Sequence, residues 1–222
     1  MTRIPVDREV LDSVRNFYAA GLNFRAHIEW ANQAHGGGYK VPTQADIGYR
    51  SPSALIASGE DIVIPKDSTG PVEFEGELVA VIGEKIRNAT EEQALKGVAG
   101  YTLGNDVSER SWQKGDRTLW RAKNSDTFKP MGPFIVYGIN PMAQTIEVRI
   151  NGKTVSSYST AGMIFGVAHY LARMSRYLTL HPGDVVWFGC DGPTVPALQH
   201  GDLVEVACAP IGVLANRVVR ES

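Results

Sequence analysis

The chain has 222 residues, of which 43% are hydrophobic and 21% are charged, and its formal net charge at pH 7 is −2. This size fits one globular domain, with or without a small N-terminal appendage. A charge so close to zero gives no indication of a nucleic-acid or anionic-membrane partner, and no apolar run is long enough to span a bilayer. The two cysteines, Cys190 and Cys208, favour a reducing cytoplasm over a disulfide framework.

The N-terminal region predicts a helix followed by a polar segment with possible chemistry. Apolar residues at helical spacing over residues 7–16 predict a short amphipathic helix, so we assign residues 1–16 to a helical appendage and residues 17–222 to one domain. His27 and Glu29 then lie close in sequence, and a nearby carboxylate can orient an imidazole as a general base. A surface histidine on a loop explains the same residues equally well. His35 and the three glycines after it indicate a mobile loop.

Residues 72–83 form a strand pattern with an unusual acidic half. Glu73, Glu75 and Glu77 alternate ahead of a β-branched apolar run, and alternate side chains of a strand share a face. Carboxylates so close together repel each other unless a positive group holds them. Two interpretations stand side by side: an edge strand with a solvated acidic face, and a site for a divalent cation, which prefers carboxylate oxygens.

The middle of the chain alternates helix, strand and charged turns. A capping box at residues 90–93 predicts a helix to about Ala99, and a strand from residue 101 runs into a polar turn that carries Asp106 and Arg110. For that pair the simpler interpretation is a turn-stabilising aspartate and a weak surface ion pair. Residues 111–120 are typical of a surface loop. Lys123 follows and suits binding of a carboxylate or an enolate, although a solvated lysine accounts for it too.

The C-terminal part predicts several strands and one more helix. Asn151-Gly152 joins two strand patterns and is a strong hairpin signal, and Thr160 is a candidate cap for a helix with an apolar stripe through Met174. A buried strand follows at residues 185–188. Cys190 comes directly after that strand; with no base adjacent in the sequence, we favour a buried, inert thiol over a nucleophile.

Several long segments, taken in order, resemble the fumarylacetoacetate hydrolase family. The resemblance covers residues 21 to 216 and depends on the ordered set rather than on a single short motif. The segments that carry it are residues 21–27, 74–83, 100–110, 122–133, 151–152, 159–165 and 180–185.

The resemblance implies a mixed, β-rich α+β fold, a roll or sandwich with a few short helices. It also implies Mg²⁺ (or Mn²⁺) held by two glutamates and an aspartate, and a substrate that is a small 2-oxo acid, in a homodimer. By motif the metal ligands are Glu75, Glu77 and Asp106, which leaves Glu73 outside the set. Arg110 and Gln113 match substrate-contacting positions, and Lys123 matches a lysine that stabilises developing negative charge.

Two departures from the family pattern affect the expected reaction. Hydrolytic members have a glutamate three residues after the histidine, whereas here Trp30 stands at that position and Glu29 comes one residue early. The usual Gly-Thr-Pro after the buried strand is replaced by Gly189-Cys190-Asp191.

The leading expectation is metal-dependent hydrolysis of a C–C bond in an acylpyruvate-like β-diketo acid. His27 with Glu29 would activate water, while Lys123 and Arg110 would stabilise the enolate product. Decarboxylation or keto–enol isomerisation needs no such dyad and is the second expectation, which Trp30 favours. A non-catalytic protein that binds a metal and a small acid is the third.

Overall fold

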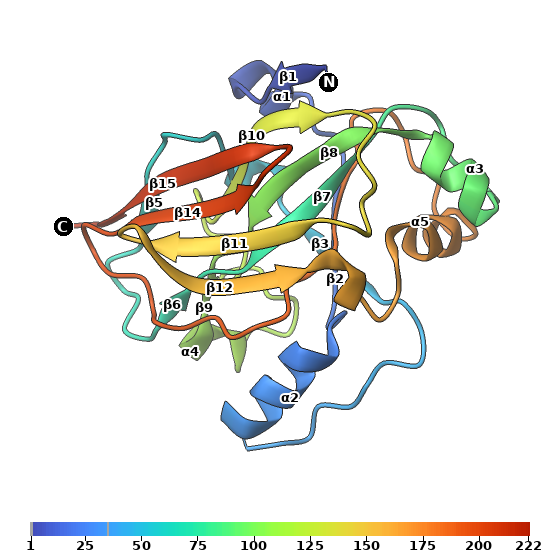
Figure 1. Cartoon of the computed structure of the whole chain (residues 1–222). Helices are drawn as coiled ribbons and strands as arrows, with labels where there is room; N and C mark the ends of the chain where they lie inside the picture. The colour runs from blue at the N-terminus through green and yellow to red at the C-terminus, as the bar shows by residue number, and fades with distance from the viewer. Residues whose placement is uncertain (1, 35) are drawn as a thin grey trace.

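The computed structural model describes residues 2–34 and 36–222. As predicted, the fold is a mixed, strand-rich α+β arrangement with a few short helices. Two sheets lie face to face, with β11, β12, β14 and β15 in the layer nearer the viewer and β7, β8 and β10 behind them (Figure 1).

The larger sheet has the strand order β1-β10-β8-β7-β13-β2-β3, and β4 pairs in parallel with the start of β10 outside this order. Its centre is antiparallel, since β7 pairs with β8 and with β13, whereas β13 and β2 run parallel. The strands are β1 (Arg3–Pro5), β2 (Phe17–Ala20), β3 (Ile47–Arg50), β4 (Leu55–Ile56), β7 (Gly76–Ile82), β8 (Val98–Asn105), β10 (Lys129–Val136) and β13 (Val185–Trp187).

The second sheet has the order β12-β11-β14-β15-β5. The Asn151-Gly152 turn joins β11 to β12 as the sequence predicts, and both turn residues have the positive φ that such a turn needs, 52° and 78°. The strands are β5 (Ile62–Ile64), β11 (Thr145–Ile150), β12 (Lys153–Ser159), β14 (Leu203–Cys208) and β15 (Gly212–Arg220).

The two faces of β7 pack into different cores. Leu78 and Ala80 face the second sheet and belong to the main core, whereas Val79 faces the other way and packs in a smaller core with Trp187 and Leu11. Because side chains alternate along a strand, β7 is buried on both sides. This double burial fixes the position of the acidic residues at its N-terminal end.

The helices lie at the periphery of the sheets. α3 and α5 lie side by side at one end, and α2 projects beside β2 (Figure 1). Thr90 and Gln93 form the predicted capping box at the start of α3. The helices are α1 (Arg8–Asp12), α2 (Arg25–Ala34), α3 (Glu91–Lys96), α4 (Arg110–Gln113) and α5 (Val167–Ser175), with 3-10 turns at Pro52–Ala54 and Thr160–Gly162.

The acidic stretch is not the single strand that its sequence pattern predicts. β6 (Val72–Glu73) pairs with β9 (Ser108–Glu109), the chain leaves the strand at Phe74, and β7 begins at Gly76. Between them the Glu75 N–H donates to Asn105 Oδ1 at 3.0 Å instead of to a strand neighbour. The chain therefore changes partner strand within the motif.

Two predicted helix boundaries are wrong. α3 ends at Lys96, because Val98 already pairs with Ile82 of the neighbouring strand. Thr160 starts only a 3-10 turn, and α5 begins after Gly166. The backbone N–H groups of residues 164 and 165 donate to the carbonyl and side chain of Asn23, so the chain cannot begin the helix there.

The sequence predicts a surface loop at residues 111–120 and a mobile loop at the three adjacent glycines. Residues 111–120 do not form a plain surface loop, since α4 extends to Gln113 and buries Trp112. The backbone N–H of Trp112 donates to Glu109 Oε2 at 2.6 Å. In the glycine loop, His35 lies outside the described residues, and the three glycines after it have φ of 84°, 87° and 99°. Only glycine adopts such values without strain.

The N-terminal segment is integrated with the larger sheet. β1 pairs with β10, Leu11 and Val14 are buried in the smaller core, and Arg8 forms two hydrogen bonds of 2.7 Å with Glu60. The domain boundary at residue 16 stays a prediction.

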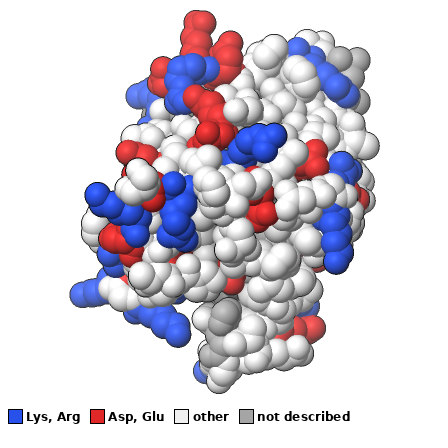
Figure 2. Space-filling view, turned by 90° about the vertical axis from the view of Figure 1, so that its left-hand side faces the viewer, with Lys and Arg blue, Asp and Glu red and all other residues white. Residues whose placement is uncertain are grey.

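Two properties of the whole chain bear on the expected partners. In the part of the chain that the structure describes, no helix has the length and apolarity to cross a membrane. On the face shown in Figure 2, acidic and basic side chains are interspersed.

Candidate active site

A cavity of about 810 Å³ opens where β7 begins and β8 ends. Its lining gathers side chains that are far apart in the sequence, and it contains every expected site residue except Glu29. These are His27, Glu75, Glu77, Asp106, Arg110, Gln113 and Lys123.

Strand pairing brings the three expected metal ligands together. Gly76 pairs with Asn105, which places Asp106 beside Glu75, and the Asp106 N–H donates to the Glu75 carbonyl at 2.8 Å. Gly76 faces the second sheet, where a Cβ would lie 2.6 Å from Val148, so its neighbours on either side point the opposite way. One carboxylate oxygen from each of the three acidic residues lies within 4.8 Å of the other two.

Lys123 bridges two of these carboxylates. Its Nζ lies 2.9 Å from Glu75 Oε2 and 2.8 Å from Asp106 Oδ2, and the side chain is buried rather than solvated. Arg110 Nη2 binds Glu75 Oε1 at 2.6 Å. Burial acts to raise the pKa of Glu75, but Lys123 and Arg110 outweigh it and lower that pKa to about 2. Glu75 is therefore ionised at neutral pH.

Asp106 carries two further cations that the sequence motifs did not identify. Arg50 Nη2 lies 3.0 Å from Asp106 Oδ2, and Lys129 Nζ lies 2.7 Å from Oδ1. Although burial opposes them, Arg50, Lys123 and Lys129 hold the pKa of Asp106 well below its usual range. Burial lowers the pKa of Lys129 itself to about 7, with Asp106 acting in the other direction.

Glu77 has a different environment from the other two acidic residues. Its Oε2 accepts a 2.7 Å hydrogen bond from the Gly189 N–H, and among the described residues no Lys or Arg nitrogen lies within 4.0 Å of it. Burial, with Asp106 and Glu75 adding to it, raises the pKa of Glu77 well above its usual range. An unpaired buried carboxylate is costly, so the site lacks positive charge at this point.

The donor set fits a hard divalent cation. Mg²⁺ and Mn²⁺ prefer oxygen ligands, and all three candidate ligands are buried carboxylates. Such an ion beside Glu77 would supply the positive charge that this side chain lacks. Glu75, Glu77 and Asp106 are therefore the residues that would hold it.

His27 lies on α2 and not on a surface loop. Its Nδ1 is 3.0 Å from the Cys190 carbonyl oxygen, and because a carbonyl only accepts, Nδ1 carries the proton and Nε2 keeps the lone pair. Burial lowers the pKa of His27, although Glu75 and the Cys190 carbonyl oppose this effect. The pocket wall thus holds a neutral imidazole whose basic nitrogen, Nε2, has no hydrogen-bond partner in the described part of the chain.

Glu29 does not pair with His27. Two residues along an α-helix turn the side chain by about 200°, so Glu29 points away and is exposed. Among the described residues no hydrogen bond or ion pair involving Glu29 occurs. Trp30 instead packs edge-on against His27, with ring centroids 5.7 Å apart. The backbone carbonyl of Cys190, which no sequence motif indicates, orients the imidazole.

Cys190 also differs from its predicted surroundings. The His27 ring lies near its thiol, with Sγ 3.6 Å from Nδ1, and only folding brings together residues 163 positions apart. Because Nδ1 carries the proton, this nitrogen cannot act as a base toward the thiol. Burial, reinforced by Glu75 and Glu77, raises the pKa of the Cys190 thiol well above its usual value. The protonated thiol is a poor nucleophile.

Arg110 is held by several protein groups. Its Nε donates to Glu73 Oε2 at 2.7 Å, Nη1 to Gln113 Oε1 at 2.9 Å and Nη2 to Glu75 and, at 3.4 Å, to Thr194 Oγ1. Thr194 in turn donates to Glu73. Glu73 lies outside the triad and is buried in this network. Gln113, whose oxygen accepts from Arg110, also lines the cavity.

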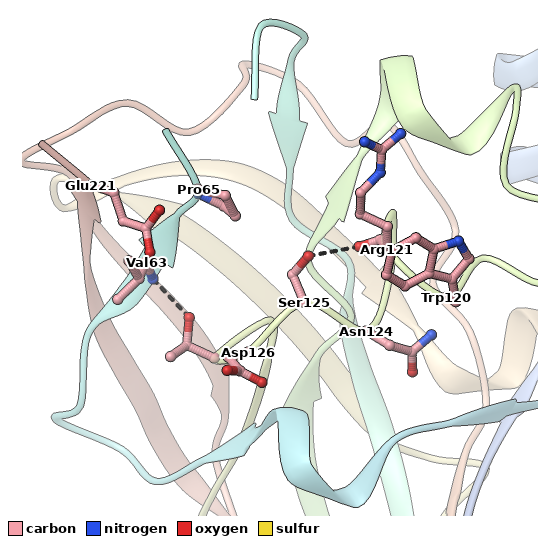
Figure 3. A pocket seen from close by; sticks show the side chains of 9 residues that line it. Val63, Pro65, Trp120, Arg121, Asn124, Ser125, Asp126 and Glu221 are labelled. Atoms are coloured by element: carbon pink, nitrogen blue, oxygen red, sulfur yellow. Dashed lines mark hydrogen bonds between the residues drawn. The ribbon is translucent and has the colours of Figure 1, made fainter. Parts of the chain in front are cut away.

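A second hollow of about 440 Å³, here called the outer hollow, is lined by residues that precede and follow Lys123 in the sequence (Figure 3). Trp120, Arg121 and Asn124 line it, whereas Leu119 and Lys123 line the acidic cavity. None of the expected site residues faces this outer hollow. We therefore place the candidate active site in the acidic cavity.

Comparison with known proteins matches the chain to one family and to several named relatives. Residues 16–219 match the family described as fumarylacetoacetate (FAA) hydrolase C-terminal. The chain is 35% identical to a 2,4-didehydro-3-deoxy-L-rhamnonate hydrolase of Sphingomonas sp., over 90% of this chain and 72% of that protein. It is 31% identical to the oxaloacetate tautomerase YisK of Bacillus subtilis, over 92% of this chain and 69% of that protein.

A solved structure shares the fold over most of this chain. The 5-carboxymethyl-2-hydroxymuconate delta-isomerase of Mycobacterium smegmatis superposes with a TM-score of 0.83 at 33% identity, covering 94% of this chain and 80% of that one. The chain belongs to the fumarylacetoacetate hydrolase family. Its relatives include enzymes named as hydrolases, isomerases and tautomerases, which makes it a member of an enzyme family without selecting one of these reactions.

Proposed function

We propose that this protein is a divalent-metal-dependent enzyme that interconverts keto and enol forms of a small 2-oxo acid. The observation that carries this proposal is the environment of His27. A neutral imidazole shares the cavity with the carboxylate triad, and among the residues that the structure describes its Nε2 has no hydrogen-bond partner and no carboxylate pairs with the ring. Such a base suits reversible proton transfer on carbon, which does not require an activated water.

Glu75, Glu77 and Asp106 would hold Mg²⁺ or Mn²⁺, and their buried oxygens support this part of the proposal. A bound ion would polarise the 2-oxo group and so favour loss of a proton from the adjacent carbon. Proton transfer and substrate binding are carried out by side chains of the chain itself.

His27 Nε2 takes the proton from the carbon next to the 2-oxo group. The C–H electron pair becomes the C=C bond, the C=O π pair moves onto the oxo oxygen, and the His27 imidazolium returns its proton to that oxygen, so the step consumes no co-reactant. Lys123, whose Nζ faces the carboxylates, supplies positive charge beside that oxygen. Gln113 offers amide donors to the substrate carboxylate, while Arg110 is engaged in holding Gln113 and Glu75.

Hydrolysis of a C–C bond is the second candidate, and the likeness to a rhamnonate-derivative hydrolase supports it. In that reaction His27 Nε2 would take a proton from water. The exposed position of Glu29 favours isomerisation, since a base without a carboxylate partner activates water less strongly.

Product analysis with matched variants separates the two candidates. The enzyme with Mg²⁺ would be incubated with the enol form of oxaloacetate and with acetylpyruvate, and the products identified by NMR. We expect faster enol–keto conversion and no C–C cleavage, with about a 100-fold or larger loss in His27→Gln and no loss in Glu29→Gln. Cleavage of acetylpyruvate that depends on Glu29 would contradict the proposal.

We also propose a homodimer and a cytoplasmic location. The dimer follows from the family resemblance. Two free cysteines, Cys190 and Cys208, support a reducing compartment.

A further inference from the structure

The cations around the triad are unevenly distributed, and Asp106 has more of them than the other two carboxylates. Arg50 reaches both of its oxygens, at 3.3 Å from Nε to Oδ1 and 3.0 Å from Nη2 to Oδ2. Lys123 adds a contact of 2.8 Å at Oδ2. Lys129 adds one of 2.7 Å at Oδ1.

These contacts leave Asp106 little capacity as a metal ligand. An ionised carboxylate offers about four lone-pair positions, and Asp106 has four contacts to cationic nitrogens. Glu77 has one described hydrogen bond, to a backbone N–H. A cation in the triad therefore meets a strong donor at Glu77 and a weakened one at Asp106.

Lys129 is the cation that has no other evident role in the cavity. Lys123, Arg50 and Arg110 line the cavity, whereas Lys129 does not and is fully buried behind Asp106. Its Nζ also donates to the carbonyls of Val107, at 2.9 Å, and Phe128, at 2.8 Å. A group held at three points keeps its position, and Lys129 contacts Asp106 without lining the cavity.

We propose that Lys129 is a positioning residue that weakens Asp106 as a ligand and thereby sets the affinity of the triad for a divalent cation. This inference depends on the proposed metal site. Replacing Lys129 with a neutral side chain frees one lone-pair position on Asp106 and restores part of its charge. The site then binds a divalent cation more tightly.

The test is Mn²⁺ binding by isothermal titration calorimetry, with a Mn²⁺-induced shift in melting temperature as a second readout. Lys129→Met keeps the aliphatic stem, and Lys129→Gln also keeps an N–H donor for the two carbonyls. Lys96→Met is the matched control, because Lys96 is exposed and pairs with Glu92 on the surface of α3. We expect Kd to fall about tenfold in both Lys129 variants and to stay unchanged in the control. Unchanged or weaker binding by folded Lys129 variants would overturn the inference.

A double-mutant cycle checks that the effect passes through Asp106. In an Asp106→Asn background, Lys129→Met should change Kd by less than about twofold, whereas a tenfold change there would refute the route through Asp106.

If the wild type binds Mn²⁺ and only the Lys129 effect is missing, this inference fails and the proposed function stands. If neither the wild type nor Lys129→Met binds Mn²⁺, both fail. Binding by Lys129→Met alone would support the inference.

Discussion

Glu77 is the residue whose charge is least compensated in the folded chain. Its pKa is raised by burial, with help from Asp106 and Glu75, and one backbone N–H is its described partner. This raised pKa makes the stability of the folded chain depend on pH. A raised folded-state pKa means that the native state favours the protonated form, so the stability it gives is present below the unfolded pKa and is lost as pH rises through the folded pKa.

Glu77→Gln should therefore stabilise the chain at pH 7 in the presence of a chelator. We expect the melting temperature to rise by at least about 2 °C, the shift that ~1 kcal/mol gives in a chain of this length. Differential scanning calorimetry in EDTA measures it, and the exposed Glu92→Gln serves as the control. A lower melting temperature for Glu77→Gln would show that the carboxylate is paired in solution.

Asp191 gives a second test of pH dependence. Its Oδ1 is buried and, among the described residues, has no hydrogen-bond partner, and burial raises its pKa to about 7, against the effect of its own backbone N–H. Stability from this group is present below the unfolded pKa and is lost as pH rises through about 7. Because the side chain is only half-buried, screening reduces the effect to about 1 kcal/mol.

Urea unfolding of Asp191→Asn at pH 5 and pH 8 measures this loss. The variant should be more stable than the wild type at pH 8 and show a smaller decrease between the two pH values. A parallel decrease in both proteins would mean that Asp191 titrates normally.

The sequence identified some site residues and missed others for a physical reason. Glu75, Glu77 and Asp106 lie in long motifs that carry the family resemblance. Arg50 and Lys129 are 56 and 23 positions from Asp106, and they meet it only because β3 and β10 lie in the same sheet as β8. No local pattern marks a lysine at the start of a strand as buried, since lysine is normally exposed.

At the scale of elements, Gly76 fixes the distance between the ligand strand and the second sheet. A Cβ at this position would lie 2.6 Å from Val148 and 3.0 Å from Val206. Gly76→Ala should cost about 1–3 kcal/mol by overpacking and displace the residues on either side of it, which weakens Mn²⁺ binding. Gly115→Ala is the control, because its nearest neighbour atom would be 3.9 Å away.

Chemical denaturation and calorimetry on these two variants test the prediction. If Gly76→Ala is destabilised but still binds Mn²⁺ with wild-type affinity, packing at this position does not set the ligand geometry. That result would contradict the prediction.

Elements with strong local signals were predictable, and those decided by distant contacts were not. The Asn151-Gly152 hairpin and the capping box at Thr90 depend on neighbouring residues alone and are confirmed. The start of α5 depends on Asn23, which lies more than 140 residues away and takes the N–H groups that the helix would use. A sequence pattern near Thr160 contains no information about that contact.

At the scale of the whole molecule, the N-terminal segment joins the smaller core to the larger sheet. Leu11 is 2% exposed and belongs to the same cluster as Trp187 and Val79. Leu11→Ala should therefore cost about 3 kcal/mol and lower the single melting transition of the entire chain. The exposed Glu9→Ala on the same helix is the control.

A separate, early transition for the N-terminal segment, with the main transition unchanged, would instead support an independent appendage. The sequence predicted a helix in this segment, although α1 ends at Asp12 and not near residue 16, and it carried no signal for the pairing of β1 with β10. Such pairing depends on residues about 130 positions away, where no local periodicity indicates the partner.

Calorimetric titration of Mn²⁺ into wild type, Glu77→Gln and Glu92→Gln tests directly whether the buried triad binds a divalent cation. We expect one Mn²⁺ site per chain in the wild type and in Glu92→Gln, and at least about a tenfold loss of Mn²⁺ affinity in Glu77→Gln. Equal affinity in all three proteins, or a wild type that binds no Mn²⁺, would contradict it.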